Sequence, residues 1–328
     1  MHAIEAAQAG GPEVLEQVEV AEPIPGPGQV LVRPAAIGLN FIETYQRSGT
    51  YPVRYPFRPG GEGAGEVVAL GEGVESLRVG DHLAWTSSVT GSYADLVLLE
   101  STQALAIPAA LDVRIAAALP LQGLTVSMLV DGAFHVERGQ DVLLTAGAGG
   151  VGLLLTQVAA HLGARVITTV STAEKEELSR AAGAADVIRY DTFGDIATEL
   201  PAAVRALTDD AGVHVVYDGV GKSTFDGSLA ALRTRGTLVL FGGASGPVPP
   251  FDPQRLNRAG SLFLTRPTMV HYIADPEERA QRWQQVSSWV TDGVVDLRVG
   301  ATFPLAEAAE AHRALEGRQT TGKVLLIP

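Results

Sequence analysis

The chain has 328 residues, no cysteine, and 37 acidic against 24 basic side chains, which gives a net charge of -13. This length accommodates one large domain or two ordinary ones, and the 46% hydrophobic fraction is sufficient for a sizeable core. The absence of cysteine excludes a disulfide scaffold, cysteine-ligated zinc, iron–sulfur clusters and a thiol nucleophile, and the acidic balance argues against nucleic acid as a partner.

No targeting or membrane segment is predicted. The first residues lack the basic region and apolar run of a signal peptide. Residues 142–160 are uncharged and have the length of a membrane span. The glycines of residues 147–152 would break a spanning helix, so a buried strand, a glycine turn and a helix explain the stretch better. We therefore expect a cytoplasmic protein.

The first third of the chain is predicted to be rich in short β-strands. Apolar runs at residues 29–33 and 65–70 alternate with Pro/Gly clusters at residues 23–28 and 59–65. This pattern is typical of strands joined by irregular loops. From about Leu124 the pattern changes to strands that alternate with longer helical stretches.

The middle of the chain predicts a doubly wound parallel sheet. Residues 141–146 form a buried-strand run, and the next segment places its apolar residues on one helical face that Gly163 can end. Further strands are predicted at residues 165–170, 185–190, 213–218 and 237–241. Strands and helices that alternate in this way indicate a Rossmann-type sheet. After about Thr265 the periodicity weakens, and the strand-like residues 322–328 indicate a return to the first domain.

A glycine-rich motif, G-x-G-x-x-G at residues 147–152, is the strongest single functional signal. It follows a predicted strand and opens an amphipathic helix, which is the context of a dinucleotide fingerprint. The glycines allow a tight turn and a close approach of the backbone to a pyrophosphate, and the helix N-terminus supplies N–H donors. The alternative is a glycine turn between strand and helix that binds no ligand.

The end of the second strand favours NADPH over NADH. An NAD site usually has an acidic residue there, whereas this chain has Val170, Ser171 and Thr172, with Lys175 one helical turn beyond. A hydroxyl and an ammonium would attract a 2′-phosphate that a carboxylate would repel. The alternative is that Lys175 solvates the helix among glutamates such as Glu174.

Candidate side chains for metal binding or nucleophilic catalysis are not grouped in this sequence. The seven histidines form no pair at metal-ligand spacing, and no G-x-S-x-G elbow is present. A reaction would therefore rely on a cofactor such as a nicotinamide. Asn40, Tyr45 and Tyr51 offer hydrogen-bond donors for a carbonyl oxygen, although a turn-forming Asn beside half-buried tyrosines explains the segment equally well.

Several motifs match one known superfamily in order along the chain. They are residues 38–45, 58–65, 122–125, the glycine fingerprint, 216–221, 265–267 and 320–328. The chain resembles the medium-chain dehydrogenase/reductase superfamily and, within it, the zinc-less NADPH:quinone oxidoreductases of the zeta-crystallin type. The resemblance implies an α/β protein with a GroES-like, β-rich catalytic domain and a Rossmann doubly wound parallel sheet.

The resemblance also implies a division of the chain into three parts. Residues 1–123 would form the first part of the GroES-like catalytic domain, residues 124–265 the Rossmann NADPH-binding domain, and residues 266–328 a return segment that completes the catalytic domain. The active site would lie in the cleft between the two domains. In zinc-containing relatives a Cys takes the place of Asn40 and a His that of Gly61, so the catalytic metal would be absent here.

Site residues follow from the same resemblance. The NADPH site would be lined by Asn40, Thr125, Gly147, Gly149, Gly150, Val151, Gly152, Ser171, Lys175, Tyr190, Phe241, Gly242 and Arg318. Within this set, Lys175, Tyr190 and Arg318 would surround the 2′-phosphate. The catalytic candidates on the substrate side are Asn40, Tyr45, Tyr51 and Arg266.

The function predicted from these residues is metal-free hydride transfer from NADPH to a small quinone. Asn40 and Tyr45 would stabilise the charge that develops on the quinone oxygen, and Tyr51 would shape the pocket. An NADPH-dependent reductase of 2-alkenals or enones and a non-catalytic NADPH-binding protein of the crystallin type are the alternatives. A homodimer is expected from the family alone, while the physiological acceptor and one-electron reduction stay open.

Overall fold

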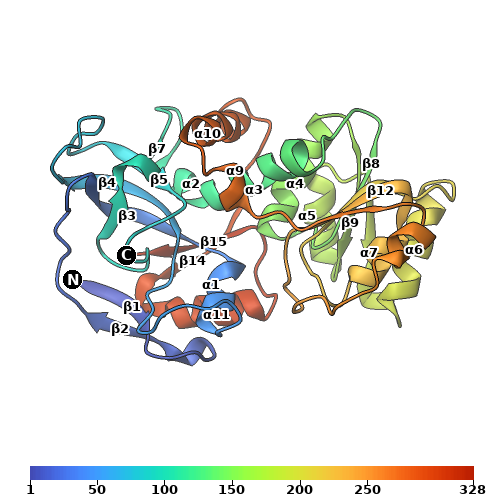
Figure 1. Cartoon of the computed structure of the whole chain (residues 1–328), viewed down its shortest axis with the longest axis horizontal. Coiled ribbons are helices and arrows are strands. Elements are labelled where there is room, and N and C mark those ends of the chain that lie inside the picture. The colour runs from blue at the N-terminus through green and yellow to red at the C-terminus, as the bar shows by residue number, and fades with distance from the viewer. The chain divides into compact units, whose positions relative to one another are not determined.

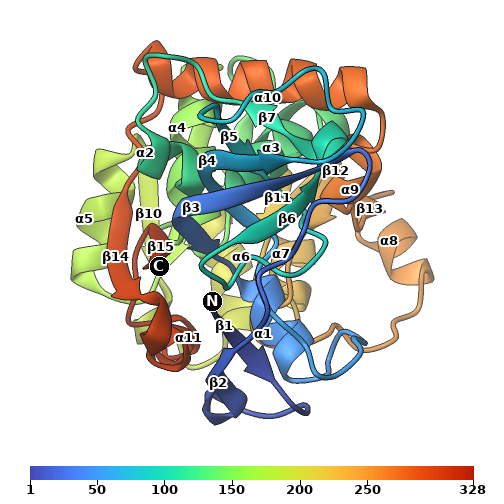
Figure 2. The ribbon, with the colours of Figure 1, turned by 90° about the vertical axis from the view of Figure 1, so that its left-hand side faces the viewer.

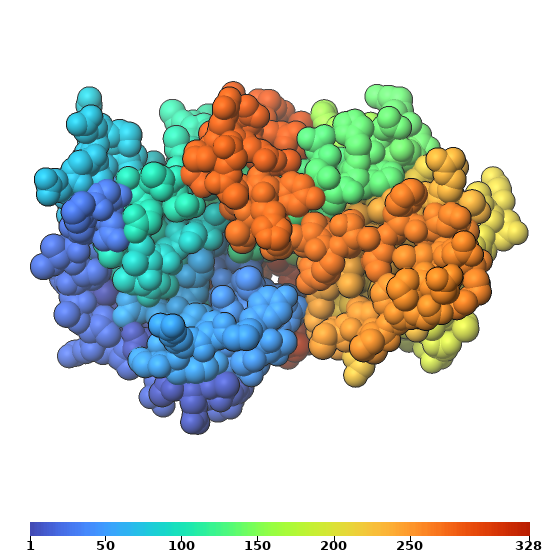
Figure 3. All heavy atoms as spheres, in the orientation of Figure 1, coloured from blue at the N-terminus to red at the C-terminus, as the bar shows by residue number.

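The computed structural model describes residues 1–328, which divide into two compact units. Unit 1 contains Met1–Gly123, Ala280–Asp292 and Leu297–Pro328, and unit 2 contains Leu124–Arg279 and Gly293–Asp296. Both ends of the chain belong to unit 1 (Figure 1). The space-filling view shows the same division, with the blue N-terminal residues in unit 1 and the green to yellow residues in unit 2 (Figure 3).

Unit 1 is built on a seven-stranded sheet with the order β14-β15-β3-β4-β5-β7, and β6 also pairs with β3. The strands are β3 (Gln29–Leu39), β4 (Glu62–Leu70), β5 (His82–Trp85), β6 (Val97–Glu100), β7 (Leu105–Ala106), β14 (Val299–Pro304) and β15 (Lys323–Ile327). A separate hairpin joins β1 (His2–Ala6) to β2 (Leu15–Glu19). Figure 2 shows β14 and β15, from the end of the chain, beside β3.

The register of β15 on β3 determines where its first side chain lies. These strands are antiparallel, with Val324 opposite Leu39, so Lys323 is placed next to the residue that follows β3. On the other side of β3, Gly38 lies opposite Glu62, the first residue of β4. Two strand ends with charged residues are thereby brought to the same end of β3.

The helices of unit 1 were not predicted from the sequence, which indicated mainly strands and loops. They are α1 (Phe41–Arg47), α2 (Val113–Ala118), α11 (Ala308–Glu316), part of α10 (Pro276–Thr291) and the start of α3 (Pro120–Ser127), with short helical turns at Pro12–Val14, Ser101–Gln103 and Leu305–Glu307. The sequence places Asn40 directly before α1, and the Glu43 carboxylate accepts a hydrogen bond from the Asn40 N–H at 2.8 Å. This contact satisfies one of the free donors at the helix start.

The longest helix, α10, lies where the apolar periodicity weakens. Its buried side chains Trp283, Val286 and Trp289 recur every three residues, among exposed glutamate and glutamine residues. The Trp283 indole N–H donates to the Ala106 carbonyl at 2.6 Å. The narrow apolar stripe holds the helix against unit 1, but a stripe this narrow gives a weak signal in the sequence.

Unit 2 contains a six-stranded sheet with the order β10-β9-β8-β11-β12-β13, and every neighbouring pair is parallel. The strands are β8 (Asp141–Leu144), β9 (Arg165–Val170), β10 (Asp186–Arg189), β11 (Val213–Asp218), β12 (Leu232–Leu240) and β13 (Phe263–Thr265). The strand order reverses between β8 and β11, which is where doubly wound sheets bind ligands. The predicted Rossmann sheet is confirmed, with β12 beginning earlier than expected.

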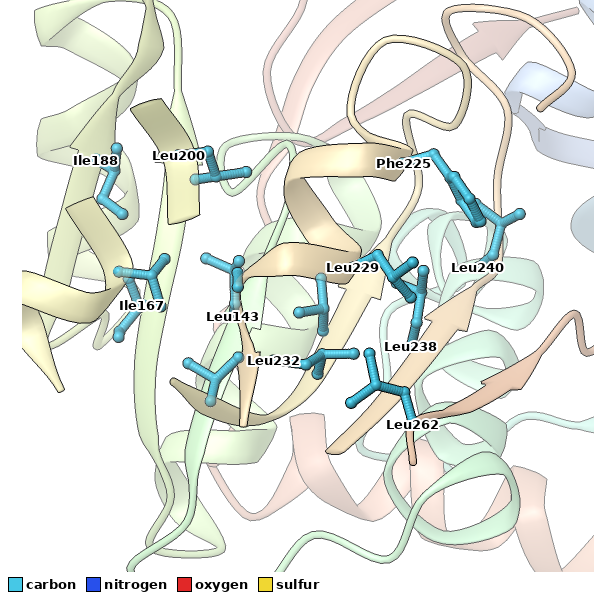
Figure 4. Packing of buried hydrophobic residues seen from close by; sticks show 14 residues of the cluster. Leu143, Ile167, Ile188, Leu200, Phe225, Leu229, Leu232, Leu238, Leu240 and Leu262 are labelled. Atoms are coloured by element: carbon cyan, nitrogen blue, oxygen red, sulfur yellow. The ribbon is translucent and has the colours of Figure 1, made fainter. Parts of the chain in front are cut away.

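Helices cover the unit 2 sheet and complete its core. They are α4 (Gly150–His161), α5 (Ala173–Ala181), α6 (Ile196–Leu207), α7 (Phe225–Ala230), α8 (Gln254–Arg258) and α9 (Met269–Tyr272), with a π-helical turn at Met128–Ala133 and a 3₁₀ turn at Tyr190–Thr192. Figure 4 shows Leu143 and Leu238 from the strands packed with Leu200 from α6 and Leu229 from α7. This hydrophobic core of unit 2 supports the loops at the carboxyl ends of the strands. None of the helices is long and apolar enough for a membrane span.

Candidate active site

Four polar side chains of unit 1 meet where β3 ends and α1 begins, and we call them the buried cluster. They are Asn40, Glu43, Glu62 and Lys323. The Lys323 ammonium donates to Asn40 Oδ1 at 2.8 Å and also to the Glu62 carboxylate. Asn40 Nδ2 donates to Glu62 Oε2 at 2.7 Å. Because Glu43, Glu62 and Lys323 have no solvent-exposed area, these charges are balanced only by each other and by backbone donors.

The backbone around this cluster donates a hydrogen bond to it and leaves space for its side chains. The Leu121 N–H at the start of α3 donates to Glu62 Oε1 at 2.7 Å, so both Glu62 oxygens are hydrogen-bonded. A Cβ added at Gly38 would lie 2.2 Å from a Glu62 oxygen and 2.9 Å from Lys323 Cε. Only glycine therefore fits opposite Glu62 on β3.

Glu43 is the second carboxyl of the buried cluster. Its Oε2 accepts from the Asn40 N–H at 2.8 Å, and its Oε1 accepts from the Gly61 N–H at 3.4 Å. Burial raises the pKa of Glu43 to about 7; the Lys323 ammonium opposes this shift and the Glu62 carboxylate adds to it. Near neutral pH, Glu43 is therefore poised between its neutral and ionised forms.

A second buried network fixes α1 against α11. Arg47 forms an ion pair with Glu316 at 2.7 Å and donates to His312 Nδ1 at 3.1 Å. Burial, with the nearby Arg47 cation, lowers the pKa of His312 to about 3, so this ring is neutral. Since Nδ1 accepts from arginine, the ring proton lies on Nε2, which is 3.1 Å from the Tyr93 hydroxyl. This network holds the helix that follows Asn40.

The predicted substrate-side tyrosines come together in unit 1. The Tyr45 and Tyr51 rings lie 5.3 Å apart at a tilt of 54°, and the Tyr51 N–H donates to the Tyr45 carbonyl at 2.9 Å. Tyr45 is on α1, one turn beyond Asn40, and Tyr51 is 40% exposed. Arg266 belongs to unit 2, where its guanidinium donates to the Pro267 carbonyl at 3.3 Å. Their roles in catalysis stay a prediction.

Most of the predicted nucleotide-binding residues follow strands of the unit 2 sheet. The glycine motif lies between β8 and α4, Ser171 follows β9, Tyr190 follows β10, and Phe241 and Gly242 follow β12. Because these strands are parallel, the residues lie at the same edge of the sheet. Thr125 and Lys175 also belong to unit 2, whereas Asn40 and Arg318 belong to unit 1. Their contacts with a nucleotide stay a prediction.

The glycine motif fits a dinucleotide pyrophosphate. Helix α4 begins after Gly149 with no side-chain cap, so its first N–H groups are available to an anion. A Cβ at Gly152 would lie 2.2 Å from the Ala146 carbonyl oxygen, and a Cβ at Gly147 would lie 2.6 Å from Thr168 Cβ. The tight turn therefore depends on glycine at both positions.

Sequence reasoning did not assign a role to Asp218, at the end of β11. This buried carboxylate accepts from the Val220 N–H at 2.8 Å and from the hydroxyls of Thr224 and Ser228 at 2.8 and 2.7 Å. It thereby fixes the loop that carries Gly219, against which the Phe241 ring packs closely enough to exclude a Cβ. An aspartate at the end of a buried strand was the signal for this role.

Sequence reasoning also missed the roles of Glu43, Glu62 and Lys323. Each lies in a segment that matched the superfamily, yet their meeting depends on strand register between distant parts of the chain. The available signal was a charged residue at the edge of an apolar strand pattern, as Lys323 is before Val324–Ile327. No group of three or more His, Cys, Asp or Glu side chains is placed to hold a metal ion.

Comparison with known proteins assigns the family. The family described as alcohol dehydrogenase GroES-like domain matches residues 26–109, and the one described as zinc-binding dehydrogenase matches residues 150–292. The quinone oxidoreductase of Pseudomonas aeruginosa is 41% identical over 326 residues, with 99% of each chain covered. A 2-haloacrylate reductase of a Burkholderia species is 39% identical, covering 97% of this chain and 96% of its own.

A solved structure agrees with these relatives. The Escherichia coli quinone oxidoreductase complexed with NADPH superposes with a TM-score of 0.96 at 39% identity, covering the whole of both chains. The fold and site thus define a medium-chain dehydrogenase/reductase, a class of oxidoreductases. Within that superfamily, the chain belongs to the quinone oxidoreductase family. This confirms the resemblance and the fold class expected from the sequence.

The buried cluster generates a prediction about stability. Lys323→Met should lower the free energy of unfolding by about 3–5 kcal/mol, because it leaves the buried Glu62 carboxylate without its cation. Adding Glu62→Gln to Lys323→Met should recover part of this loss. Urea denaturation followed by circular dichroism measures both, and the exposed Lys222→Met serves as the control. A loss no larger than that of the control would contradict the structural role of Lys323.

Proposed function

We propose that this chain catalyses the NADPH-dependent, metal-free reduction of small quinones to hydroquinones. The observation that carries the proposal is the fixed amide of Asn40, held at the start of α1 by Lys323 and Glu62 in a member of the quinone oxidoreductase family. When bound, NADPH supplies the hydride. The absence of cysteine, with Gly61 where zinc-containing relatives have a histidine, supports a mechanism without a catalytic metal.

Substrate activation then depends on hydrogen-bond donors of unit 1. Hydride addition places negative charge on a quinone oxygen, which preorganised donors stabilise. The Asn40 amide nitrogen carries two hydrogens, of which the bond to Glu62 occupies one. The other can bind the acceptor oxygen, and we assign Tyr45 as the second donor. The exposed Tyr51 ring packs against Tyr45 and shapes the entrance.

The second candidate function is the reduction of activated carbon–carbon double bonds in enals, enones or haloacrylates. The 2-haloacrylate reductase is nearly as similar to this chain as the quinone oxidoreductase, at 39% against 41% identity. The same cofactor serves both reactions, and in both the acceptor gains negative charge after hydride addition. The two functions therefore differ only in the acceptor that the pocket admits.

A substrate panel tests the proposal. NADPH oxidation by the purified protein should be fast with small quinones and slow with enones and 2-haloacrylates. Asn40→Ala combined with Tyr45→Phe should lower kcat/KM for quinones by about a hundredfold, because one or two oxyanion donors are lost. Unchanged kcat/KM would refute these roles. Tight NADPH binding without turnover of any acceptor would favour the non-catalytic alternative instead.

The cofactor preference is tested separately. Lys175 follows β9 at the position that we assign to the 2′-phosphate, along with Tyr190 and Arg318. The protein should bind NADPH more tightly than NADH, and Lys175→Ala should weaken NADPH binding about tenfold while leaving NADH binding unchanged, since one charged phosphate contact is lost. Fluorescence titration of both nucleotides measures the effect, and equal affinities in the unmodified protein would overturn the assignment.

A homodimer is the expected assembly, and β13 supports it. This strand pairs only with β12 and leaves its other edge unpaired, and its Phe263 side chain is 59% exposed. Exposed strand edges with apolar side chains favour association. Phe263→Glu should shift the solution mass from two chains to one in analytical ultracentrifugation, while Val79→Glu, an equally exposed site in unit 1, should not. A single-chain mass for the unmodified protein would refute the dimer.

A further inference from the structure

The reaction proposed above needs a proton as well as a hydride. A quinone that accepts the hydride from NADPH becomes a hydroquinone anion, and one proton on its charged oxygen completes the product. The balance is NADPH + quinone + H⁺ → NADP⁺ + hydroquinone. The acceptor alone does not provide this proton, so a group of the chain or water has to donate it.

The buried cluster contains one cation for two carboxyl groups. Lys323 is paired with Glu62, and no second ammonium or guanidinium hydrogen-bonds to Glu43, whose oxygens accept only from backbone N–H groups. All three side chains are fully buried. With Glu43 ionised the cluster has a net charge of -1, and with Glu43 neutral it has none. Burial without a second cation therefore favours the neutral, protonated form of Glu43.

Glu43 also borders a cavity of about 490 Å³ in unit 1. The wall includes Ile42, Gly61 and Leu121 near Glu43, and the ion pair of Arg58 with Glu5 at 2.7 Å. Arg58 Nε is buried without a protein acceptor. The polar and charged groups of this wall suit the cavity to a polar molecule next to the Glu43 carboxyl.

Two other titratable side chains near Glu43, Tyr93 and Arg47, do not exchange this proton. Tyr93 packs near it from the loop before β6, and burial keeps its pKa well above the usual range, so its hydroxyl stays neutral. On α1 itself, Arg47 is committed to Glu316 and His312 on α11. Burial raises the pKa of Glu43 to about 7, so this carboxyl changes its charge near neutral pH.

We propose that Glu43 is the proton donor of the reaction: the buried cluster stores one proton on its carboxyl, and the acceptor takes up that proton after hydride addition. The O–H bond of Glu43 breaks, an O–H bond forms on the acceptor oxygen, and the carboxylate regains a proton from solvent by way of the cavity that it borders. Lys323 and Glu62 are positioning residues, because they fix Asn40 and set the charge of the cluster. This inference rests on the proposed reductase function.

The stored proton can be measured without any substrate. Infrared difference spectra of the full chain, titrated across neutral pH, should show the C=O band of a protonated carboxyl disappearing with a midpoint near 7. Glu43→Gln should remove that band, Glu43→Asp should retain a titrating carboxyl, and the exposed Glu75→Gln should leave the band unchanged. The absence of such a band in the unmodified protein would overturn the proposal.

Turnover provides the second readout. In the unmodified protein kcat for a quinone should fall as pH rises through the Glu43 pKa, because the donor loses its proton. Glu43→Gln should lower kcat about a hundredfold, as expected for loss of a general acid, abolish this pH dependence, and leave the NADPH dissociation constant unchanged. Wild-type kcat and pH profile in Glu43→Gln would refute the donor role.

The two proposals fail in different ways. If no quinone or enone is reduced, the reductase function and the delivery of the proton are both wrong, while the infrared titration still decides whether Glu43 holds a proton. If quinones are reduced at the wild-type rate by Glu43→Gln, the reductase function stands and only the role of Glu43 is wrong. Should Glu43→Gln fail to fold, the Glu43→Asp titration and the wild-type pH profile decide the outcome.

Discussion

The architecture of unit 1 depends on the placement of one ammonium, that of Lys323, in a site with no solvent-exposed area. A buried lysine is costly unless carboxylate and carbonyl oxygens replace its hydration. Glu62 and Asn40 provide those oxygens, and they can do so only because β15 and β4 pair with β3 in the observed register. The need of the Lys323 ammonium for these oxygens therefore constrains the pairing of β15 and of β4 with β3. It also requires glycine at position 38 and fixes the orientation of the Asn40 amide.

The two units contribute different groups to the proposed reaction. Unit 2 offers backbone N–H groups and small residues at the carboxyl edge of a parallel sheet, a surface suited to a nucleotide. Unit 1 offers fixed side chains whose hydrogen bonds and charges suit an acceptor that becomes negative. Neither unit has a group of His, Cys, Asp or Glu side chains placed to hold a metal ion, and next to Asn40 the Lys323 ammonium provides a buried positive charge.

Local patterns predicted unit 2 well. The strand at Val213–Asp218 was predicted with its observed bounds, and the glycine motif was placed between strand and helix, because strand alternation and helix starts are short-range properties. Helix α10 was missed because its apolar stripe is narrow. The buried cluster was beyond a single sequence, since Lys323 and Asn40 are 283 residues apart and only the sheet register joins them. The superfamily motifs identified the segments that contain these residues, but they did not show which side chains contact one another.

The pairing of β15 with β3 makes unit 1 a discontinuous domain, which has a consequence for biosynthesis. Unit 2 is almost contiguous, so it can begin to fold while the ribosome is still translating, as domains generally do. Unit 1 has to wait, because Lys323 is made 261 residues after Glu62, and until β15 pairs with β3 the Glu62 carboxylate has no cation. A chain that lacks β15 would therefore retain the strands of the parallel sheet without a complete buried cluster.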